Sequence, residues 1–287
     1  MKEEGFGPVA VSGLGLIGGS FAWAMKKRGL RVFGMVRDPA KALAVLRAGA
    51  IDAVADGAML KQCALVLVAL PPAASLEFLR KHAGDFAPGS LVIDICGVKR
   101  AVCDEAWRIA DDGGFRFVGG HPMAGKERAG FANSSAELFR GASMILCFRE
   151  PPPPEEFARI EGFFLSLGFG RVVTTDPATH DRIIAHTSQL AHVLSASYVR
   201  NRAAREHFGF SAGSFRDMIR VAAMDDAVWS ELFLDNRDNL AAEIDELIGS
   251  LGRFRDAIRA GDRGTLAALI RESAAIKHEI DAADTKG

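Results

Sequence analysis

A glycine-rich loop near the amino terminus has the spacing of a dinucleotide-binding turn. Gly13, Gly15 and Gly18 follow the apolar run Val9–Ser12 and open a helical stretch. The first glycine permits a tight turn, the second lets the backbone approach a pyrophosphate, and the third lets helix and strand pack closely. Free N–H groups at the helix start would then face the anion. The predicted cofactor site also includes Leu14, Leu16, Ile17, Leu70 and Pro71.

The end of the second predicted strand bears on which dinucleotide is bound. An NAD site usually has an acid there, about 20 residues beyond the loop, which holds the ribose hydroxyls. The run Arg31–Val36 ends without an acid, and Arg37 and Asp38 follow. Arg37 would suit the 2′-phosphate of NADP. We therefore favour NADP over NAD; the alternatives are that Asp38 is a displaced acid and that Arg37 is a solvated loop residue.

His121 is the candidate proton acceptor. It lies just past the run Arg116–Val118, at the edge of the sheet where open α/β domains bind ligands. Gly119, Gly120 and Gly125 surround it and would let a ligand approach. Oxidation of an alcohol by hydride transfer also removes the hydroxyl proton, and neutral imidazole accepts protons well near pH 7. The alternative is a structural hydrogen-bonding histidine.

The elements that position these residues alternate between β-rich and helical character up to about residue 175. The β-rich runs are Val9–Ser12, Arg31–Val36, Leu65–Leu70, Leu91–Ile95, Arg116–Val118, Met144–Phe148 and Arg171–Thr174. The helical stretches are Gly19–Arg28, Pro39–Ala48, Ser75–His82, Arg100–Asp111 and Glu155–Leu167. Alternation of apolar strands with helices predicts a doubly wound, Rossmann-type α/β domain with a parallel sheet over residues 1–175.

The second half, residues 176–287, is predicted to be all helical. Asp176 and Pro177 suit the cap and first turn of a helix. Apolar residues then recur at helical spacing along Leu240–Ile258 and again along Leu266–Ile280. These stripes exceed what one helical layer can bury, so we expect a homodimer through this helical domain.

Composition excludes several classes of protein. The 287 residues carry 35 basic and 36 acidic side chains, so no basic field favours nucleic acid or an anionic membrane. No apolar run is long enough to cross a membrane, and no secretory leader precedes the first strand. The four cysteines have no metal-binding spacing, so we expect them reduced and buried, no metal site, and a cytoplasmic protein.

Several segments together carry a resemblance to a known family. They are Gly13–Ser20, Asp94–Lys99, His121–Gly130, His180–His192 and Phe215–Trp229. On these segments the chain resembles the prephenate/arogenate dehydrogenases of tyrosine biosynthesis. The resemblance implies a nucleotide domain joined to a helical, dimer-forming domain. It also implies oxidative decarboxylation, in which hydride leaves the ring carbon bearing the hydroxyl and carbon dioxide leaves as the ring becomes aromatic.

The resemblance assigns roles to individual residues. His121 matches the catalytic base, Arg220 the arginine that holds the substrate side-chain carboxylate, and His192 a second histidine of the substrate pocket. A guanidinium group grips a carboxylate bidentately, which suits a dicarboxylate substrate. Arg216 lies one helical turn before Arg220 and either contacts substrate or pairs with an acid such as Asp217.

The chain departs from the family pattern at several positions. Gly97 stands where a serine commonly orients the catalytic imidazole, so His121 needs another partner, for which Ser188 is our candidate. Gln189 and Ala191 replace a histidine and a proline of the second histidine segment. The third departure is the missing acid after the second strand.

Other polar residues are expected to be ordinary. We expect His180, His186 and His207 to be exposed or capping rather than extra catalytic groups. We expect Lys99 and Lys126 to be solvated; the alternative is that they assist an anionic substrate. Two other functions stay open: another two-domain NAD(P)-dependent 3-hydroxyacid dehydrogenase or reductase, and a nicotinamide-nucleotide sensor without turnover. The first would use a lysine or another proton donor in the helical half.

Overall fold

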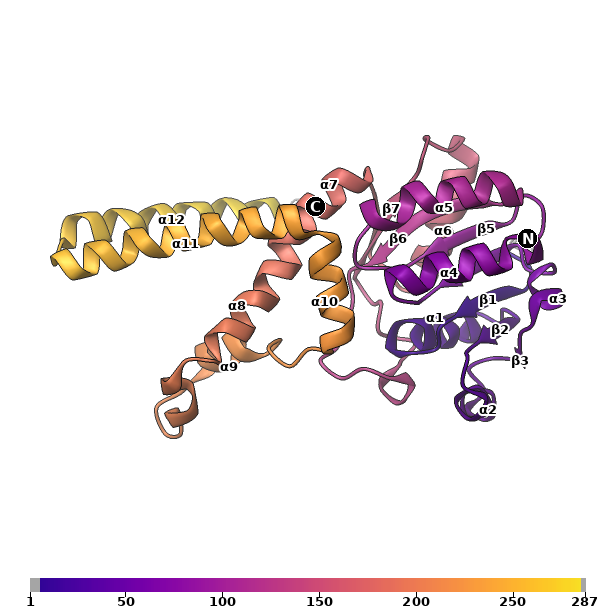
Figure 1. Ribbon diagram of the computed structural model, residues 1–287, viewed down its shortest axis with the longest axis horizontal. Coiled ribbons are helices and arrows are strands. Elements are labelled where there is room, and N and C mark those ends of the chain that lie inside the picture. Colours follow the sequence, from indigo (N-terminus) through magenta and orange to yellow (C-terminus); the bar gives the residue numbers. More distant parts are fainter. Residues whose placement is uncertain (1–5, 285–287) are drawn as a thin grey trace. The chain divides into compact units, whose positions relative to one another are not determined.

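The computed structural model describes residues 6–284, which form two compact units that divide between Arg237 and Asp238. Figure 1 shows the elements along the chain. The first unit contains a twisted sheet with helices on both faces, followed by a series of shorter helices. The change from mixed α/β structure to helices falls within this unit, after Thr174.

One eight-stranded sheet forms the centre of the first unit. Its strands are β1 (Val9–Ser12), β2 (Val32–Met35), β3 (Ala53–Val54), β4 (Leu65–Val68), β5 (Leu91–Asp94), β6 (Arg116–Pro122), β7 (Ser143–Cys147) and β8 (Arg171–Thr174). Their spatial order is β3-β2-β1-β4-β5-β6-β7-β8. The first six strands of the chain are parallel, in the order of a Rossmann fold.

The predicted doubly wound α/β fold is confirmed, and its mostly parallel sheet contains one antiparallel pairing near an edge. β7 pairs with β6 in the antiparallel sense, and β8 is parallel to β7. Between β6 and β7 the chain has only a short 3₁₀ turn, Phe131–Asn133, and no crossover helix. Parallel neighbours usually require such a helix, so the chain returns antiparallel here.

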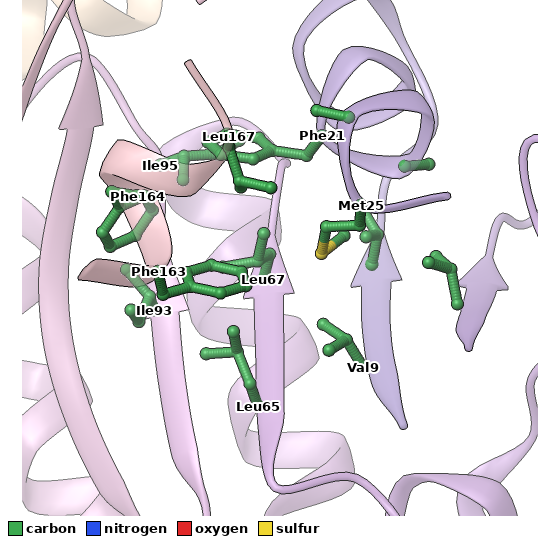
Figure 2. Packing of buried hydrophobic residues seen from close by; sticks show 14 of the residues in the cluster. Val9, Phe21, Met25, Leu65, Leu67, Ile93, Ile95, Phe163, Phe164 and Leu167 are labelled. Atoms are coloured by element: carbon green, nitrogen blue, oxygen red, sulfur yellow. The ribbon is translucent and has the colours of Figure 1, made fainter. Parts of the chain in front are cut away.

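Six helices accompany the sheet: α1 (Leu16–Lys27), α2 (Pro39–Ala48), α3 (Gly57–Leu60), α4 (Pro72–His82), α5 (Arg100–Gly113) and α6 (Pro154–Ser166). Buried residues of α1 and α6 pack on one face, as Figure 2 shows for Phe21, Met25, Phe163, Phe164 and Leu167. Residues of α4 and α5 pack on the opposite face. The predicted strands and long helices are confirmed to within a few residues, whereas β3 and α3 went unpredicted because they are two and four residues long.

The strand register brings the candidate residues to one edge of the sheet. Ser12 is aligned with Val68, Val68 with Asp94, and Asp94 with Gly119. The segments that follow β1, β4 and β5 therefore emerge beside the last residues of β6. These are the glycine loop, Leu70–Pro71 and the Asp94–Lys99 segment, which lie at the same edge as His121.

Short helices follow β8 in the first unit. They are α7 (Pro177–Ile184), the π-helical η3 (Ala185–Leu190), α8 (Ala191–Tyr198), the 3₁₀ helix η4 (Arg202–Glu206), α9 (Gly213–Ile219) and α10 (Asp226–Asp235). The Asp176 carboxylate accepts a hydrogen bond from the Thr179 amide and Pro177 opens α7, which confirms the predicted cap. The described residues beyond Thr174 contain no strand, as predicted.

The second unit is a helical hairpin of α11 (Arg237–Ala260) and α12 (Arg263–Asp284), joined at Gly261. Leu240, Ala257 and Leu269 are buried. Other members of the predicted apolar stripes are exposed by half or more of their surface, namely Leu251, Ile258, Ile270, Ile276 and Ile280. Among the described residues, no helix is both long and apolar enough to cross a membrane.

Candidate active site

The glycine loop has the geometry that anion binding requires. Gly13 has a positive φ of 84°, and a Cβ there would lie 2.2 Å from the Ala69 carbonyl oxygen. A Cβ on Gly18 would lie 1.9 Å from the Gly13 oxygen, whereas one on Gly15 would meet nothing within 4 Å. The first turn of α1 has no side-chain cap and no acidic residue. Its amide groups are therefore open to a pyrophosphate, and the loop fits a dinucleotide.

The other residues assigned to the cofactor lie differently around this loop. The Leu70 side chain lies against Gly13, because a Cβ on Gly13 would be 2.8 Å from Leu70 Cδ2. Pro71 is the residue before α4. Leu14 is buried in the core, so only its backbone is free to line the site, whereas Leu16 and Ile17 are half-buried.

Of the two residues after β2 that could select the cofactor, one makes hydrogen bonds within the protein and the other is exposed. Asp38 caps α2, and its Oδ1 accepts hydrogen bonds from the amides of Ala40 (2.8 Å) and Lys41 (3.4 Å). Arg37 is exposed beside it. The acid that could hold a ribose hydroxyl is thus already used as a helix cap, while the guanidinium group faces solvent.

His121 lies within β6 rather than just past a strand, because β6 continues to Pro122 and pairs His121 with Ile145 of β7. Burial, the neighbouring His180 and the positive charge of Lys99 hold the pKa of His121 well below its usual value. The imidazole is therefore neutral at pH 7, as a proton acceptor must be.

A hydrogen-bonded chain of side chains leads away from His121. Its Nδ1 lies 2.9 Å from Nε2 of His180, and Nδ1 of His180 lies 2.7 Å from Oδ1 of Asp181. His180 is 2% exposed, so the expectation of an exposed or capping histidine is wrong. The expected partner of His121, Ser188, instead accepts a hydrogen bond at its backbone oxygen from Nδ1 of His192 (2.9 Å).

Asp181 is fully buried and holds the start of α5. Its carboxylate accepts hydrogen bonds from the backbone amides of Lys99 (2.7 Å) and Arg100 (2.9 Å). Burial raises the pKa of Asp181, but the hydrogen bonds from His180 and from these two amides outweigh burial and lower the pKa overall. Asp181 is therefore ionised and connects α7 to the nucleotide-binding part of the unit.

Lys99 is fully buried, so the expectation of a solvated lysine is also wrong. Its ammonium group pairs with Asp94 and donates to the Gly120 oxygen at 2.7 Å. A Cβ on Gly119 would lie 2.5 Å from Cys103 Sγ and 3.1 Å from Lys99 Cδ. Gly119 therefore makes room for these buried side chains rather than for a ligand. The ion pair joins β5 to the start of α5, and hydrogen bonds from Lys99 to the Gly120 oxygen and from the Gly120 amide to Asp94 connect both to β6, next to His121.

The residues proposed for substrate lie on the helices after β8. Arg220, the residue after α9, pairs with Glu127 of the loop after β6 at 2.9 Å, and its side chain is 63% exposed. The ring of His192 packs on that of Trp229, with centroids 3.8 Å apart, and burial lowers the pKa of His192. Arg216 is exposed on α9.

Two of the departures from the family pattern have structural consequences. Gln189 is buried, donates to the Leu232 oxygen (3.1 Å) and accepts from the Asn236 amide (2.8 Å), which ties η3 to the end of α10. A Cβ on Gly97 would lie 3.4 Å from Leu232. Gly97 offers no hydroxyl group to His121.

The remaining candidates are peripheral. His186 and Lys126 are exposed, as expected, and His207 packs on Phe215 in an exposed turn. All four cysteines are buried, as predicted, and none of them forms a disulfide. Within residues 6–284, no cluster of histidine, cysteine and acidic side chains could hold a metal ion.

A glycine loop at the carboxyl edge of a Rossmann sheet, beside a half-buried neutral histidine, defines a nicotinamide-dependent dehydrogenase. Residues 21–174 match the family model described as "Prephenate dehydrogenase, nucleotide-binding domain". Residues 176–272 match the model described as "Prephenate dehydrogenase, dimerization domain". The chain belongs to the prephenate dehydrogenase family.

Individual relatives agree with this assignment. The chain is 31% identical to the prephenate dehydrogenase of Bacillus subtilis (strain 168) over 268 residues, which cover 90% of this chain and 72% of the relative. It is 30% identical to the cyclohexadienyl dehydrogenase of Zymomonas mobilis over 93% of this chain and 94% of the relative. The fold matches that of the prephenate dehydrogenase from A. aeolicus in complex with hydroxyphenyl propionate and NAD+, with a TM-score of 0.86, 24% identity, and coverage of 97% of this chain and 100% of that chain.

Proposed function

We propose that the chain oxidatively decarboxylates prephenate (or arogenate) to 4-hydroxyphenylpyruvate (or tyrosine), with NADP or NAD as hydride acceptor, in tyrosine biosynthesis. The observation that carries the proposal is His121, held neutral at the sheet edge beside a loop that fits a dinucleotide. The bound nicotinamide supplies the hydride acceptor.

The side chains accept the hydroxyl proton and bind the substrate. His121 accepts the proton of the ring hydroxyl, which allows the oxidation to proceed. Arg220 binds the side-chain carboxylate of the dicarboxylate substrate through its guanidinium fork. His192 lines the same pocket, with Ser188 and Arg216 as further substrate contacts. Glu127 pairs with Arg220, and this ion pair breaks when Arg220 binds the substrate carboxylate.

The alternative hydroxyacid dehydrogenases would use a lysine of the helical half. In the described part of that half the only lysine is Lys277, which lies exposed on α12 and pairs with Asp281. The direct test is absorbance at 340 nm with prephenate, arogenate and 3-hydroxyisobutyrate, each with NADP and NAD. Reduction with prephenate or arogenate supports the proposal, and reduction with 3-hydroxyisobutyrate alone favours the alternative. Cofactor binding without reduction favours the sensor.

We also propose the domain division at 175/176, with the nucleotide-binding domain before it and the helical substrate and dimerisation domain after it. We place the enzyme in the cytoplasm, with small-molecule partners and no nucleic acid or membrane. The four cysteines are buried and form no disulfide with one another, which supports a reducing compartment.

Arg37→Ala is expected to erase a preference for NADP. The exposed guanidinium group of Arg37 can pair with a 2′-phosphate, which NAD lacks, and one such contact favours NADP by about 10- to 150-fold in kcat/KM. Kinetics with NAD should change little, because NAD has no 2′-phosphate with which Arg37 could pair. Wild-type preference for NAD, abolished by Asp38→Ala, would instead establish Asp38 as the ribose acid.

The helical half is expected to form a two-fold homodimer. Leu251, Ile258 and Ile270 keep more than half of their surface exposed in the single chain, and a matching surface on a second copy would bury them. Light scattering at micromolar concentration should give twice the 30.7 kDa mass of one chain. A monomer mass for the wild-type protein would contradict this prediction. The double variant Leu251→Glu, Ile258→Glu should be a monomer, because the two charged side chains would have to be buried in the dimer.

A further inference from the structure

We infer that His180 and Asp181 are positioning residues that fix the tautomer of His121, with the proton on Nδ1 and the lone pair on Nε2. The inference rests on the proposed function, in which His121 is the base. It assigns roles to two residues for which the sequence predicts none.

The hydrogen-bond chain permits one assignment of protons when Asp181 is ionised. The Lys99 and Arg100 amides can only donate, so both oxygens of Asp181 are acceptors. Nδ1 of His180, 2.7 Å from Oδ1, must therefore donate to Asp181. A neutral imidazole has a single N–H group, so Nε2 of His180 accepts. Nδ1 of His121, 2.9 Å away, must then carry the proton, which leaves Nε2 of His121 as the base atom.

The charges around the two rings favour this neutral arrangement. Lys99 and Asp94 face them from the β5–α5 segment, and Asp181 from α7. Burial lowers the pKa of His180 although Asp181 opposes the shift, and burial, His180 and Lys99 lower the pKa of His121. A protonated His180 would place a second cation beside the buried Lys99 ammonium group. It would also reverse the His121 hydrogen bond and put the proton of His121 on Nε2.

The pair is itself held rigidly. Asn236 donates to the backbone oxygen of Asp181 at 2.8 Å and to Gln189 at 2.8 Å, and Gln189 donates to Leu232. These contacts tie α7 and η3 to α10, and Asp181 ties α7 to the start of α5. Because Gly97 has no side chain, His180 is the group that the described structure provides to orient the His121 ring.

The first test compares two variants of His180. His180→Leu removes both hydrogen bonds, and we expect kcat to fall about 10²-fold, since a misplaced proton disables a general base. KM and the cofactor Kd should stay within about twofold, because His180 touches neither ligand in the proposed site. His180→Gln keeps an acceptor for His121 and a donor for Asp181, so it should recover most of the lost kcat.

A matched control lies at the far end of α4. His82 forms another His–Asp pair, with its Nδ1 2.8 Å from Oδ2 of Asp85, away from the site. His82→Gln should leave kcat unchanged. A fall in kcat for His180→Leu with no recovery in His180→Gln would overturn the positioning role, since it would indicate only a general packing defect.

The second test needs no turnover. Long-range ¹H–¹⁵N correlation spectra of histidine-labelled protein distinguish the two imidazole tautomers, and His121→Asn assigns the resonances. We expect His121 to carry its proton on Nδ1 in the wild type and in His180→Gln. A wild-type proton on Nε2 would overturn the inference even if every substrate is turned over. The Nδ1 tautomer in a protein that does not oxidise prephenate or arogenate would support it while contradicting the proposed function.

Discussion

His121→Asn is expected to lose most turnover and to retain dinucleotide binding. Loss of a general base costs about 10²–10⁴-fold in kcat. The asparagine amide can still donate to Nε2 of His180, so the substitution removes the Nε2 base atom while it preserves the hydrogen bond to His180. The glycine loop follows β1, whereas His121 lies in β6, so the substitution should leave cofactor binding unchanged.

The measurement pairs steady-state kcat with cofactor Kd from fluorescence titration. His207→Asn is the control, because His207 lies in an exposed turn and bonds only to Ser211 and the Phe215 ring in the described contacts. A His121→Asn variant within about threefold of the wild-type kcat would remove His121 from the role of base.

Arg220→Ala should raise KM much more than it lowers kcat. The guanidinium group grips a carboxylate that stays charged in ground and transition states alike, so the contact contributes uniform binding. Loss of one charge-assisted contact implies a fall of about 10- to 150-fold in kcat/KM. Arg220→Lys should recover only part of this, because lysine has charge but no fork.

Two controls identify the residue responsible. Arg202→Ala removes an exposed arginine that pairs with Glu206 on η4, and it should leave KM unchanged. Arg216→Ala tests the neighbouring cation on α9. An unchanged KM in Arg220→Ala together with a raised KM in Arg216→Ala would transfer the carboxylate contact to Arg216.

The fold was predictable from the sequence where the local pattern of apolar residues matches the burial of the element in the folded chain. Apolar runs such as Leu65–Val68 and Leu91–Asp94 are buried on both faces, and this is the pattern that predicts central parallel strands. The direction of β7 was not predictable in the same way. Its residues are those of any buried strand, and only the path of the preceding loop determines which way it runs.

The site was predictable in part. The spacing of Gly13, Gly15 and Gly18 is local, and the structure shows the close contacts that exclude a side chain at the first and third. The burial of Lys99 and His180 depends on partners distant in the chain, since His180 lies 59 residues beyond His121. A single histidine or lysine has no local signal for such burial. The adjacent residues His180 and Asp181 gave a local indication, because the carboxylate of an acid next to a histidine can accept a hydrogen bond from the imidazole.

The proposed reaction couples oxidation to loss of carbon dioxide at one site, and the stoichiometry of the products tests this coupling. Prephenate labelled at the ring carboxylate should be incubated with enzyme and NADP or NAD. We expect equal amounts of labelled carbon dioxide, reduced cofactor and 4-hydroxyphenylpyruvate, and we expect all three to fall by the same factor in His121→Asn. Arogenate labelled in the same way should give tyrosine if it is the substrate. Binding of the cofactor with neither labelled carbon dioxide nor reduced cofactor from either compound would contradict the proposed oxidative decarboxylation.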